Sequence, residues 1–268
     1  MRVKCIQALI DKIRGKERIT NKKIYKKLLE LEKNFRIDIN TIFKYISHGI
    51  ELHPSYCCER VIINDYHDIL LEDSKFPVWY YEHIYRYLFV QTYINDADSV
   101  LDIACGSGYG SKLIQETTNA SSVLGADLSH EIINFANRLN TNGKVSFKQA
   151  NALNDKSFDH ESFSKIISFE TLEHVCEEDM KIMLTNFFKW LKPDGLLLCS
   201  TPFEKVAPLF INGQKINQYH FKHYYDYQIK NIISELGYKN IKIFYQDIKS
   251  FHTEPTENTP YMLIIAQK

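Results

Sequence analysis

A glycine-rich turn with an acidic residue on either side is the strongest chemical signal in this sequence. In the run VLDIACGSGYG, residues 100–110, Asp102 stands four positions ahead of Gly106, and Gly108 follows. Glycines at such a turn let the backbone approach a ligand with no Cβ in the way. Asp127 ends the next β-branched run, where its carboxylate can accept hydrogen bonds from both hydroxyls of a ribose. These residues predict a binding site for a ligand that contains adenosine.

Two details indicate which adenosine ligand this turn suits. The glycines follow a GxGxG spacing, and Ser111 stands where a dinucleotide-binding turn has its third Gly or Ala. In addition, a carboxylate at Asp102 is poorly suited to a pyrophosphate, whereas it attracts a ligand that carries an ammonium and a sulfonium, both cationic. The turn therefore favours S-adenosylmethionine over NAD.

Short β-branched runs alternate with helical runs around this turn and must position it. Strands are predicted at Ser99–Ala104, Ser122–Asp127, Val145–Gln149, Lys165–Phe169, Leu196–Ser200, Ile241–Tyr245 and Met262–Ala266. Helices are predicted at Pro77–Ile94, Gly110–Thr117, His130–Asn140, Glu177–Leu191 and Ile229–Leu236. Such alternation is typical of an α/β fold with a doubly wound, mostly parallel sheet that helices cover on both faces.

Residues 1–70 show a different pattern and are predicted to form a helical N-terminal extension, separate from a domain at residues 77–268. Basic and apolar residues alternate there at helical spacing, and residues 1–35 hold eleven Lys and Arg against four Asp and Glu. A basic arm of this kind can contact RNA, lipid or an acidic partner, or form only a solvated helix face.

Composition excludes several classes of protein. Across 268 residues, 33 Lys and Arg balance 33 Asp and Glu, so no overall basic field calls for nucleic acid or an anionic membrane. None of the six cysteines forms a Cys-x-x-Cys pair, which argues against a disulfide framework or a cysteine zinc site. No signal peptide and no membrane-spanning run is recognisable. We therefore expect a cytoplasmic protein.

Five ordered motifs within residues 77–268 resemble those of the class I methyltransferases, which use S-adenosylmethionine. They are VLDIACGSGYG (100–110), GADLS (125–129), QANAL (149–153), ISFETLEHV (167–175) and LKPDGLLLCSTP (191–202). Each motif is weak by itself, but the ordered set is specific. The resemblance implies a Rossmann-like sheet of seven strands, the last of them antiparallel.

The resemblance also implies which residues bind the cofactor, at the strand ends and in the turns that follow them. They are Asp102, Ala104, Gly106 and Gly108 for the methionine part, Asp127 for the ribose, Leu128, Asn151 and Ala152 for the adenine, and Phe169 and Glu170 for the loop that closes the site. The aromatic helix at Pro77–Ile94 is similar to the family's lid helix. Tyr81, His83 and Arg86 are therefore expected either to cover the cofactor or to pack in the core.

Three histidines are candidates for the base that takes the acceptor's proton: His174, His220 and His223. Glu170, Glu173 and His174 would share one face of a helix that begins near Glu170. The group has three interpretations: a general base tuned by glutamates, a Mg or Mn site formed by Glu170, Glu173, His174 and His220, or a motif that only orients its loop. The metal interpretation follows from a resemblance to ubiquinone-pathway O-methyltransferases and small-RNA terminal 2′-O-methyltransferases, although many metal-free family members share the motif.

The function that these features favour is methyl transfer from S-adenosylmethionine to an oxygen, rather than a nitrogen, of a small-molecule or glycan acceptor. The connection Pro202–Gln228 is rich in aromatic residues and histidines, which suit a planar ring, a sugar face or an unstacked base. One alternative is a metal-assisted RNA terminal 2′-O-methyltransferase whose basic arm, Lys4–Lys27, lines the site. Another is a non-catalytic scaffold that retains the fold and binds a partner.

Overall fold

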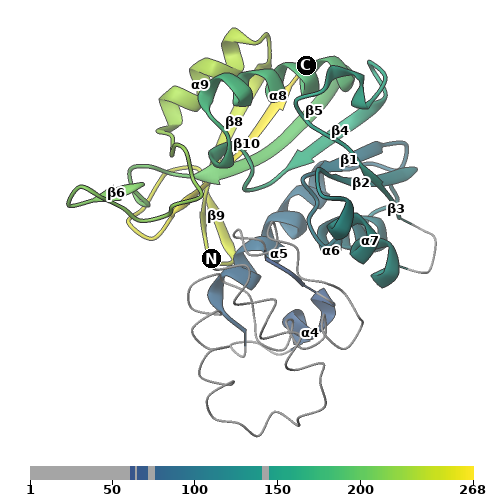
Figure 1. Cartoon of the computed structure of the whole chain (residues 1–268), viewed down its shortest axis with the longest axis horizontal. Coiled ribbons are helices and arrows are strands. Elements are labelled where there is room, and N and C mark those ends of the chain that lie inside the picture. Colours follow the sequence, from purple (N-terminus) through teal and green to yellow (C-terminus); the bar gives the residue numbers. More distant parts are fainter. Residues whose placement is uncertain (1–60, 64, 72–75, 141–144) are drawn as a thin grey trace, which may run out of the picture. The chain divides into compact units, whose positions relative to one another are not determined.

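The computed structural model describes residues 61–63, 65–71, 76–140 and 145–268 (Figure 1). The compact unit from Asp65 to Lys268 is the one considered below. The predicted extension at residues 1–70 lies outside the described residues except for its last positions, where α4 (Tyr66–Leu71) is helical. No helix of the described part is long and apolar enough to cross a membrane.

Eight strands form one sheet in the order β3-β2-β1-β4-β5-β10-β8-β9. The first five in this order are parallel to one another, and β10 is antiparallel to both of its neighbours, β5 and β8. The bounds are β1 (Ser99–Ile103), β2 (Ser122–Asp127), β3 (Ser146–Gln149), β4 (Phe163–Ser168), β5 (Leu191–Pro202), β8 (Lys239–Asp247), β9 (Ser250–His252) and β10 (Tyr261–Gln267). The predicted α/β fold, with a mostly parallel sheet and an antiparallel last strand, is confirmed.

Helices cover both faces of this sheet. Figure 1 shows α8 (Glu177–Trp190) and α9 (Asp226–Glu235) on one face, and α5 (Val78–Val90), α6 (Tyr109–Thr117) and α7 (His130–Leu139) on the other. The helices start and end within a few residues of their predicted bounds. The remaining short elements are η2 (Gln91–Tyr93), η3 (Asp155–Ser157), η4 (Leu172–His174) and a small hairpin of β6 (Phe210–Ile211) and β7 (Gln214–Lys215).

Strand β9 is one more than the seven strands expected. It follows β8 after a two-residue turn and pairs with it in antiparallel fashion. A strand of three residues is too short to show an alternating pattern, which is why the sequence did not reveal it. The strand supports α5, because the ring of Phe89 stacks on that of Phe251 with centroids 4.2 Å apart.

Alternation along β1 directs one carboxylate away from the main core. Leu101 and Ile103 lie in the apolar cluster to which α8 contributes Phe187 and Trp190. Because neighbouring strand residues point to opposite faces, Asp102 faces the side that carries α5 and α6. A buried carboxylate needs hydrogen-bond donors, and these two helices supply them.

Candidate active site

The candidate site lies at the carboxyl end of the parallel strands, the edge at which doubly wound sheets bind ligands. There β1 runs into the glycine turn, β2 ends at Asp127, and β4 leads to Glu170 two residues after its end. Residues that are far apart in the sequence therefore meet at one edge of the sheet, as the strand assignments predicted.

The glycine turn after β1 is left-handed at three positions: Ala104 (φ 66°), Gly106 (φ 56°) and Gly108 (φ 82°). Gly106 N donates to Asp127 Oδ2 at 3.1 Å, and Ser129 N donates to Asp127 Oδ1 at 3.0 Å. The buried Asp127 carboxylate thus fixes the turn through both of its oxygens. This geometry is compatible with the ribose contact expected of Asp127.

Asp102 lies behind the turn, 1 % exposed, between α5 and α6. Ser111 Oγ donates to its Oδ2 at 2.6 Å, and Tyr87 Oη lies 3.1 Å from Oδ1 and 3.3 Å from Oδ2. Burial raises the pKa of Asp102 to about 7, with a contribution from the charge of Asp127, although the bonds from Ser111 and Tyr87 oppose the rise. The carboxylate is therefore poised to ionise when a cation binds in front of it.

Gly110 allows Tyr87 to reach Asp102, and replacing it should break this arrangement. A Cβ at Gly110 would overlap the Tyr87 ring. We expect Gly110→Ala to lower the free energy of unfolding by about 1–3 kcal/mol, the usual cost of overpacking a core. Urea denaturation measures the loss, and Tyr87→Leu in the same background should recover part of it because the smaller side chain makes room. Strictly additive effects of the two substitutions would contradict this explanation.

On the adenine side the structure shows an exposed apolar side chain next to an ordered turn. Leu128, directly after Asp127, is 62 % exposed. Asn151 Oδ1 accepts from Leu153 N at 2.9 Å, and Ala152 O accepts from Asn186 Nδ2 at 2.8 Å. These bonds fix the turn after β3 and leave Leu128 available for an apolar ring, as expected for an adenine contact.

The lid-helix residues are mainly packed. Tyr81 is buried, and Lys249 Nζ lies 4.7 Å from its ring centroid. His83 Nδ1 pairs with Tyr109 Oη at 3.1 Å, so His83 is joined to the first residue of α6. Of the two expectations for this helix, the contacts support core packing for Tyr81, while a contact to the cofactor remains a prediction.

Arg86 is fully buried and connects α5 to the end of β4. Its Nε donates to Gln246 Oε1 at 2.7 Å, and its guanidinium lies 4.3 Å from the centroid of the Tyr261 ring. Its Nη1 lies 3.6 Å from Glu170 Oε1, which also accepts from Ser200 Oγ at 2.7 Å. These contacts hold the Glu170 carboxylate toward α5 and β5.

The backbone at Glu170 corrects the sequence prediction. Glu170 has a φ of 48°, and the only helical residues that follow directly belong to the 3₁₀ turn η4. The expectation that Glu170, Glu173 and His174 share one face of a helix is therefore wrong. Phe169 precedes this kink with its ring centroid 4.9 Å from that of Tyr87, so Phe169 packs against the lid helix.

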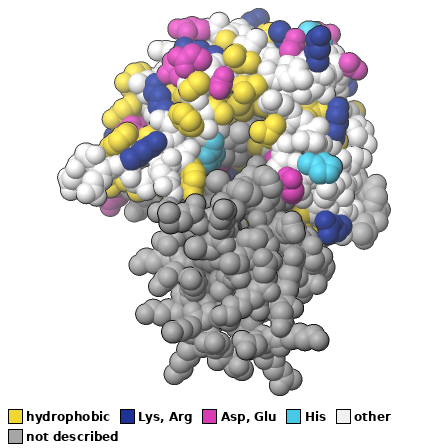
Figure 2. Space-filling model, viewed as in Figure 1, with side chains coloured by type: hydrophobic (Ala, Val, Ile, Leu, Met, Phe, Trp, Pro, Cys, Tyr) yellow, Lys and Arg dark blue, Asp and Glu magenta, His cyan; other side chains and the backbone are white. Residues whose placement is uncertain are grey.

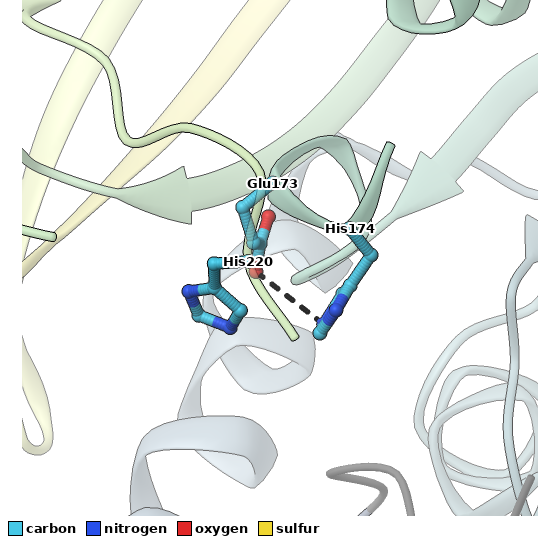
Figure 3. Close-up of side chains that lie close together, drawn as sticks. All are labelled: Glu173, His174 and His220. Carbon is cyan, nitrogen blue, oxygen red and sulfur yellow. Dashed lines mark ion pairs between the residues drawn. The ribbon is translucent and has the colours of Figure 1, made fainter. Parts of the chain in front are cut away.

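Three of the four side chains considered as metal ligands do converge (Figure 3). One ligand atom each of Glu173, His174 and His220 lies within 4.8 Å of the others. Glu173 is fully buried: its Oε2 accepts from Thr201 Oγ1 at 3.1 Å, whereas its Oε1 has no hydrogen-bond partner among the described residues. His174 Nε2 is 4.0 Å from that Oε1. Burial, together with the charge of Glu170, raises the pKa of Glu173 well above its usual range.

His220 and His223 form a chain of hydrogen bonds whose partners assign the tautomers. His223 Nδ1 donates to the Ala207 carbonyl at 2.6 Å, so its Nε2 accepts from His220 Nδ1 at 2.6 Å. His220 Nε2 in turn accepts from Asn217 Nδ2 at 3.0 Å. Burial lowers the pKa of His223, which favours the neutral imidazole that this chain requires.

The structure thus brings together the three predicted histidines, with the His174 and His220 ring centroids 4.7 Å apart and those of His220 and His223 4.9 Å apart. It does not bring Glu170 into the group. Sequence reasoning missed Tyr87 and Ser111 as partners of Asp102, although Ser111 stood out as the departure from the dinucleotide fingerprint.

Comparisons with known proteins agree with this geometry. The sequence model of a family described as a methyltransferase domain matches residues 100–195. Phosphoethanolamine N-methyltransferase of Plasmodium falciparum is 31% identical over 153 residues, 55% of this chain and 56% of that protein. Juvenile hormone acid O-methyltransferase of Bombyx mori is 25% identical over 164 residues, 54% of this chain and 58% of that protein.

A solved structure shares the fold. The S-adenosylmethionine-dependent methyltransferase from Archaeoglobus fulgidus superposes with a TM-score of 0.53 and 21% identity, over 68% of this chain and 92% of that chain. The chain spans a little over half the length of the two curated relatives named above. The matched region contains the glycine turn, Asp127 and the Glu173–His174 pair.

Proposed function

The chain contains a class I S-adenosylmethionine-dependent methyltransferase domain, and from this premise we propose that it transfers the cofactor's methyl group to a hydroxyl or amine of a small-molecule acceptor. The observation that carries the proposal is one sheet edge with two sets of residues. The glycine turn with Asp127 lies at the ends of β1 and β2. Glu173 and His174 follow β4, and His220 joins them from the connection between β5 and α9.

For methyl transfer the protein has to align the acceptor with the methyl group and to handle one proton transfer. A lone pair of the acceptor attacks the methyl carbon, the carbon–sulfur bond breaks, and its electron pair stays on sulfur to give S-adenosylhomocysteine. The acceptor's proton has to leave. In our proposal His174 takes it, because its side chain is partly exposed while Glu173 and His220 beside it are buried.

The acceptor atom that the cluster suits best is oxygen. A hydroxyl must lose its proton as the new carbon–oxygen bond forms, so it needs a base in the transition state, whereas a neutral amine can attack first. The two curated relatives are named as an N-methyltransferase and an O-methyltransferase. Nitrogen therefore remains the competing acceptor, and a small molecule is the acceptor class that both relatives' names support.

The RNA alternative is weaker on this structure. It required Glu170 to join Glu173, His174 and His220, whereas Arg86 and Ser200 hold Glu170 elsewhere. The arm Lys4–Lys27, which it also required, lies outside the described residues.

Two measurements test the proposal. Isothermal titration of S-adenosylmethionine and S-adenosylhomocysteine into the full chain is expected to show binding, and NAD is expected to show none.

A transfer assay with labelled S-adenosylmethionine then compares hydroxylated small molecules, amines such as phosphoethanolamine, and an RNA with a free 3′ end. Turnover on a hydroxylated acceptor supports the proposal, turnover on RNA alone contradicts it, and binding with no turnover favours the scaffold alternative. Failure to bind either cofactor form would overturn the enzyme assignment.

A competing interpretation of the cluster is a divalent-cation site, in which the His174 imidazole binds the cation and is not the base; the unpartnered oxygen of Glu173 favours it. Glu173 Oε1, with the imidazoles of His174 and His220, offers one oxygen and two nitrogen ligands, a set that suits Mn more than Mg. His220 Nδ1 donates to His223, the usual orientation of a metal-binding imidazole, so a cation would bind His220 Nε2 in place of the Asn217 amide.

If the cluster is a metal site and not a general base, Mn should stabilise the EDTA-treated protein. A 100-fold excess of metal over its Kd should add about 2.7 kcal/mol to the free energy of unfolding. Thermal unfolding with and without Mn measures this, and His220→Gln should remove the effect. The matched control, exposed His160→Gln, should keep it. An equal response of the wild type and His220→Gln would exclude a metal at this cluster.

A further inference from the structure

The connection between β5 and α9 carries a hairpin that projects from the body of the domain (Figure 1). Strands β6 and β7 are joined by Asn212 (φ 50°) and Gly213 (φ 76°), the pair of left-handed residues typical of a tight two-residue turn. All residues from 210 to 216 are exposed. We call this hairpin, together with Ile216 and Phe221, the apolar tip.

Large apolar side chains stand in water on the apolar tip. The exposed fractions are 55% for Phe210, 52% for Ile211, 57% for Ile216 and 63% for Phe221. Phe210 and Ile211 are neighbours in a strand and so point to opposite faces of the hairpin. A rigid partner that covered one face would leave the other in water, whereas the fluid interface of a bilayer surrounds both. The distribution therefore favours insertion over docking into a groove.

The charges around the apolar tip match an anionic surface. The segment from Phe203 to Tyr225 holds three lysines and one glutamate, and Lys222 pairs with Glu177 of α8, so Lys205 and Lys215 carry the basic charge. Lys215 pairs with Phe210 across the hairpin, and its Nζ lies 6.0 Å from the centroid of the Phe221 ring. Figure 2 shows apolar and basic side chains next to one another on this projecting part. Aromatic residues with adjacent lysines are typical of segments that lie in the headgroup region of a bilayer.

The apolar tip is also joined to the active site. Phe221 N donates to the Glu173 carbonyl at 2.6 Å, and Phe221 follows His220 directly. A surface that holds the apolar tip would therefore lie near the cluster of Glu173, His174 and His220.

From these observations we propose that the apolar tip inserts into the headgroup region of a bilayer that carries anionic lipids, and that the protein binds such membranes peripherally through it. The proposal does not depend on the methyl-transfer reaction. It implies that an acceptor can reach the site from the bilayer surface.

Vesicle sedimentation with the full chain tests this surface. The wild type is expected to bind vesicles of phosphatidylcholine mixed with phosphatidylglycerol and to bind pure phosphatidylcholine weakly. Phe210→Ser with Ile211→Ser should lower the partition coefficient by about tenfold or more, because two apolar side chains lose their burial. Lys215→Glu should weaken binding to the anionic vesicles only. Ile182→Ser on α8, a substitution at a comparably exposed position, is the matched control and should change nothing.

Three outcomes would overturn the proposal: no binding of the wild type to either vesicle, equal binding by the Phe210→Ser/Ile211→Ser variant, or a dimer in sedimentation velocity that this variant dissolves without lipid. The last outcome would identify a second copy of the chain as the occupant. S-adenosylhomocysteine binding by the same variant should stay at the wild-type level. Its loss would point to misfolding instead. In that case Phe210→Trp tests the proposal in an otherwise native chain, because the fluorescence of a tryptophan at this position shifts when it inserts into a bilayer.

Discussion

Asp102→Asn is expected to weaken S-adenosylhomocysteine binding roughly 10- to 100-fold and, in the same protein, to raise the stability of the cofactor-free state at pH 8. The two effects share one cause. Asp102 is buried, and its pKa is raised to about 7, so the charge that attracts the cofactor's ammonium is costly to hold in the absence of the cofactor. An amide of the same shape keeps the contacts to Tyr87 and Ser111 in part, but carries no charge.

The sign of the pH dependence follows from the raised pKa. The folded state binds the Asp102 proton more tightly than the unfolded chain does, so this residue's contribution to stability falls as the pH rises from about 4 to about 7. Above pH 7 the ionised carboxylate costs about 4 kcal/mol, at about 1.4 kcal/mol per pKa unit. Asp102→Asn removes that cost, so the difference in stability between variant and wild type should be largest at pH 8 and small at pH 4.

The affinity for the cofactor should rise with pH, whereas the contribution of Asp102 to stability falls. Below pH 7 the Asp102 proton must leave before the cofactor's cation binds, so the Kd of S-adenosylhomocysteine should rise by up to about tenfold per pH unit as the pH falls from 7 to 5.5. Titration calorimetry over this range measures it, and Asp102→Asn should flatten the profile. A wild-type Kd that is independent of pH, or a variant that binds as tightly as the wild type, would show that Asp102 does not act on the cofactor.

The sequence predicted most of this site because its residues sit at strand ends. The β-branched runs around Asp102 and Asp127 indicated a parallel sheet, and such sheets bring the carboxyl ends of their strands to one edge. The partners that come from helices were harder to predict. Tyr87 looked like one aromatic residue among many in α5, and only the packing of α5 against α6 shows that it bonds Asp102.

Glu170 and the apolar tip illustrate two other limits. The spacing of Glu170, Glu173 and His174 fits a helix. No helix begins at Glu170, however, because its backbone is left-handed and its carboxylate is held by Arg86 and Ser200. Such long-range contacts leave no local pattern. The hairpin, in contrast, does carry a local signal, because Asn212–Gly213 is a strong two-residue turn. The region was predicted only as a long loop, since its strands are two residues each.

His174→Asn is expected to lower kcat by about 100- to 10,000-fold, the range measured when a general base is removed. Binding of S-adenosylhomocysteine should be unchanged, because the bonds that fix the glycine turn run from Gly106 and Ser129 to Asp127. The measurement is a steady-state assay with the acceptor found in the screen, beside a titration of S-adenosylhomocysteine. Exposed His160→Asn, which replaces a histidine in the loop between β3 and β4, is the control and should keep full activity.

A companion variant separates the base from the residues that orient it. Glu173→Gln keeps the shape of a fully buried side chain and removes the carboxyl group beside His174. If Glu173 only orients the imidazole, Glu173→Gln should lower kcat less than His174→Asn does. The kcat of the double variant should then be little lower than that of His174→Asn alone, because the effects of residues that act as one unit are not additive. If the two substitutions lowered kcat by factors that simply multiply in the double variant, Glu173 and His174 would not act in the same proton transfer. Normal turnover by His174→Asn would remove His174 as the base and leave the histidine chain at His220 as the next residue to replace.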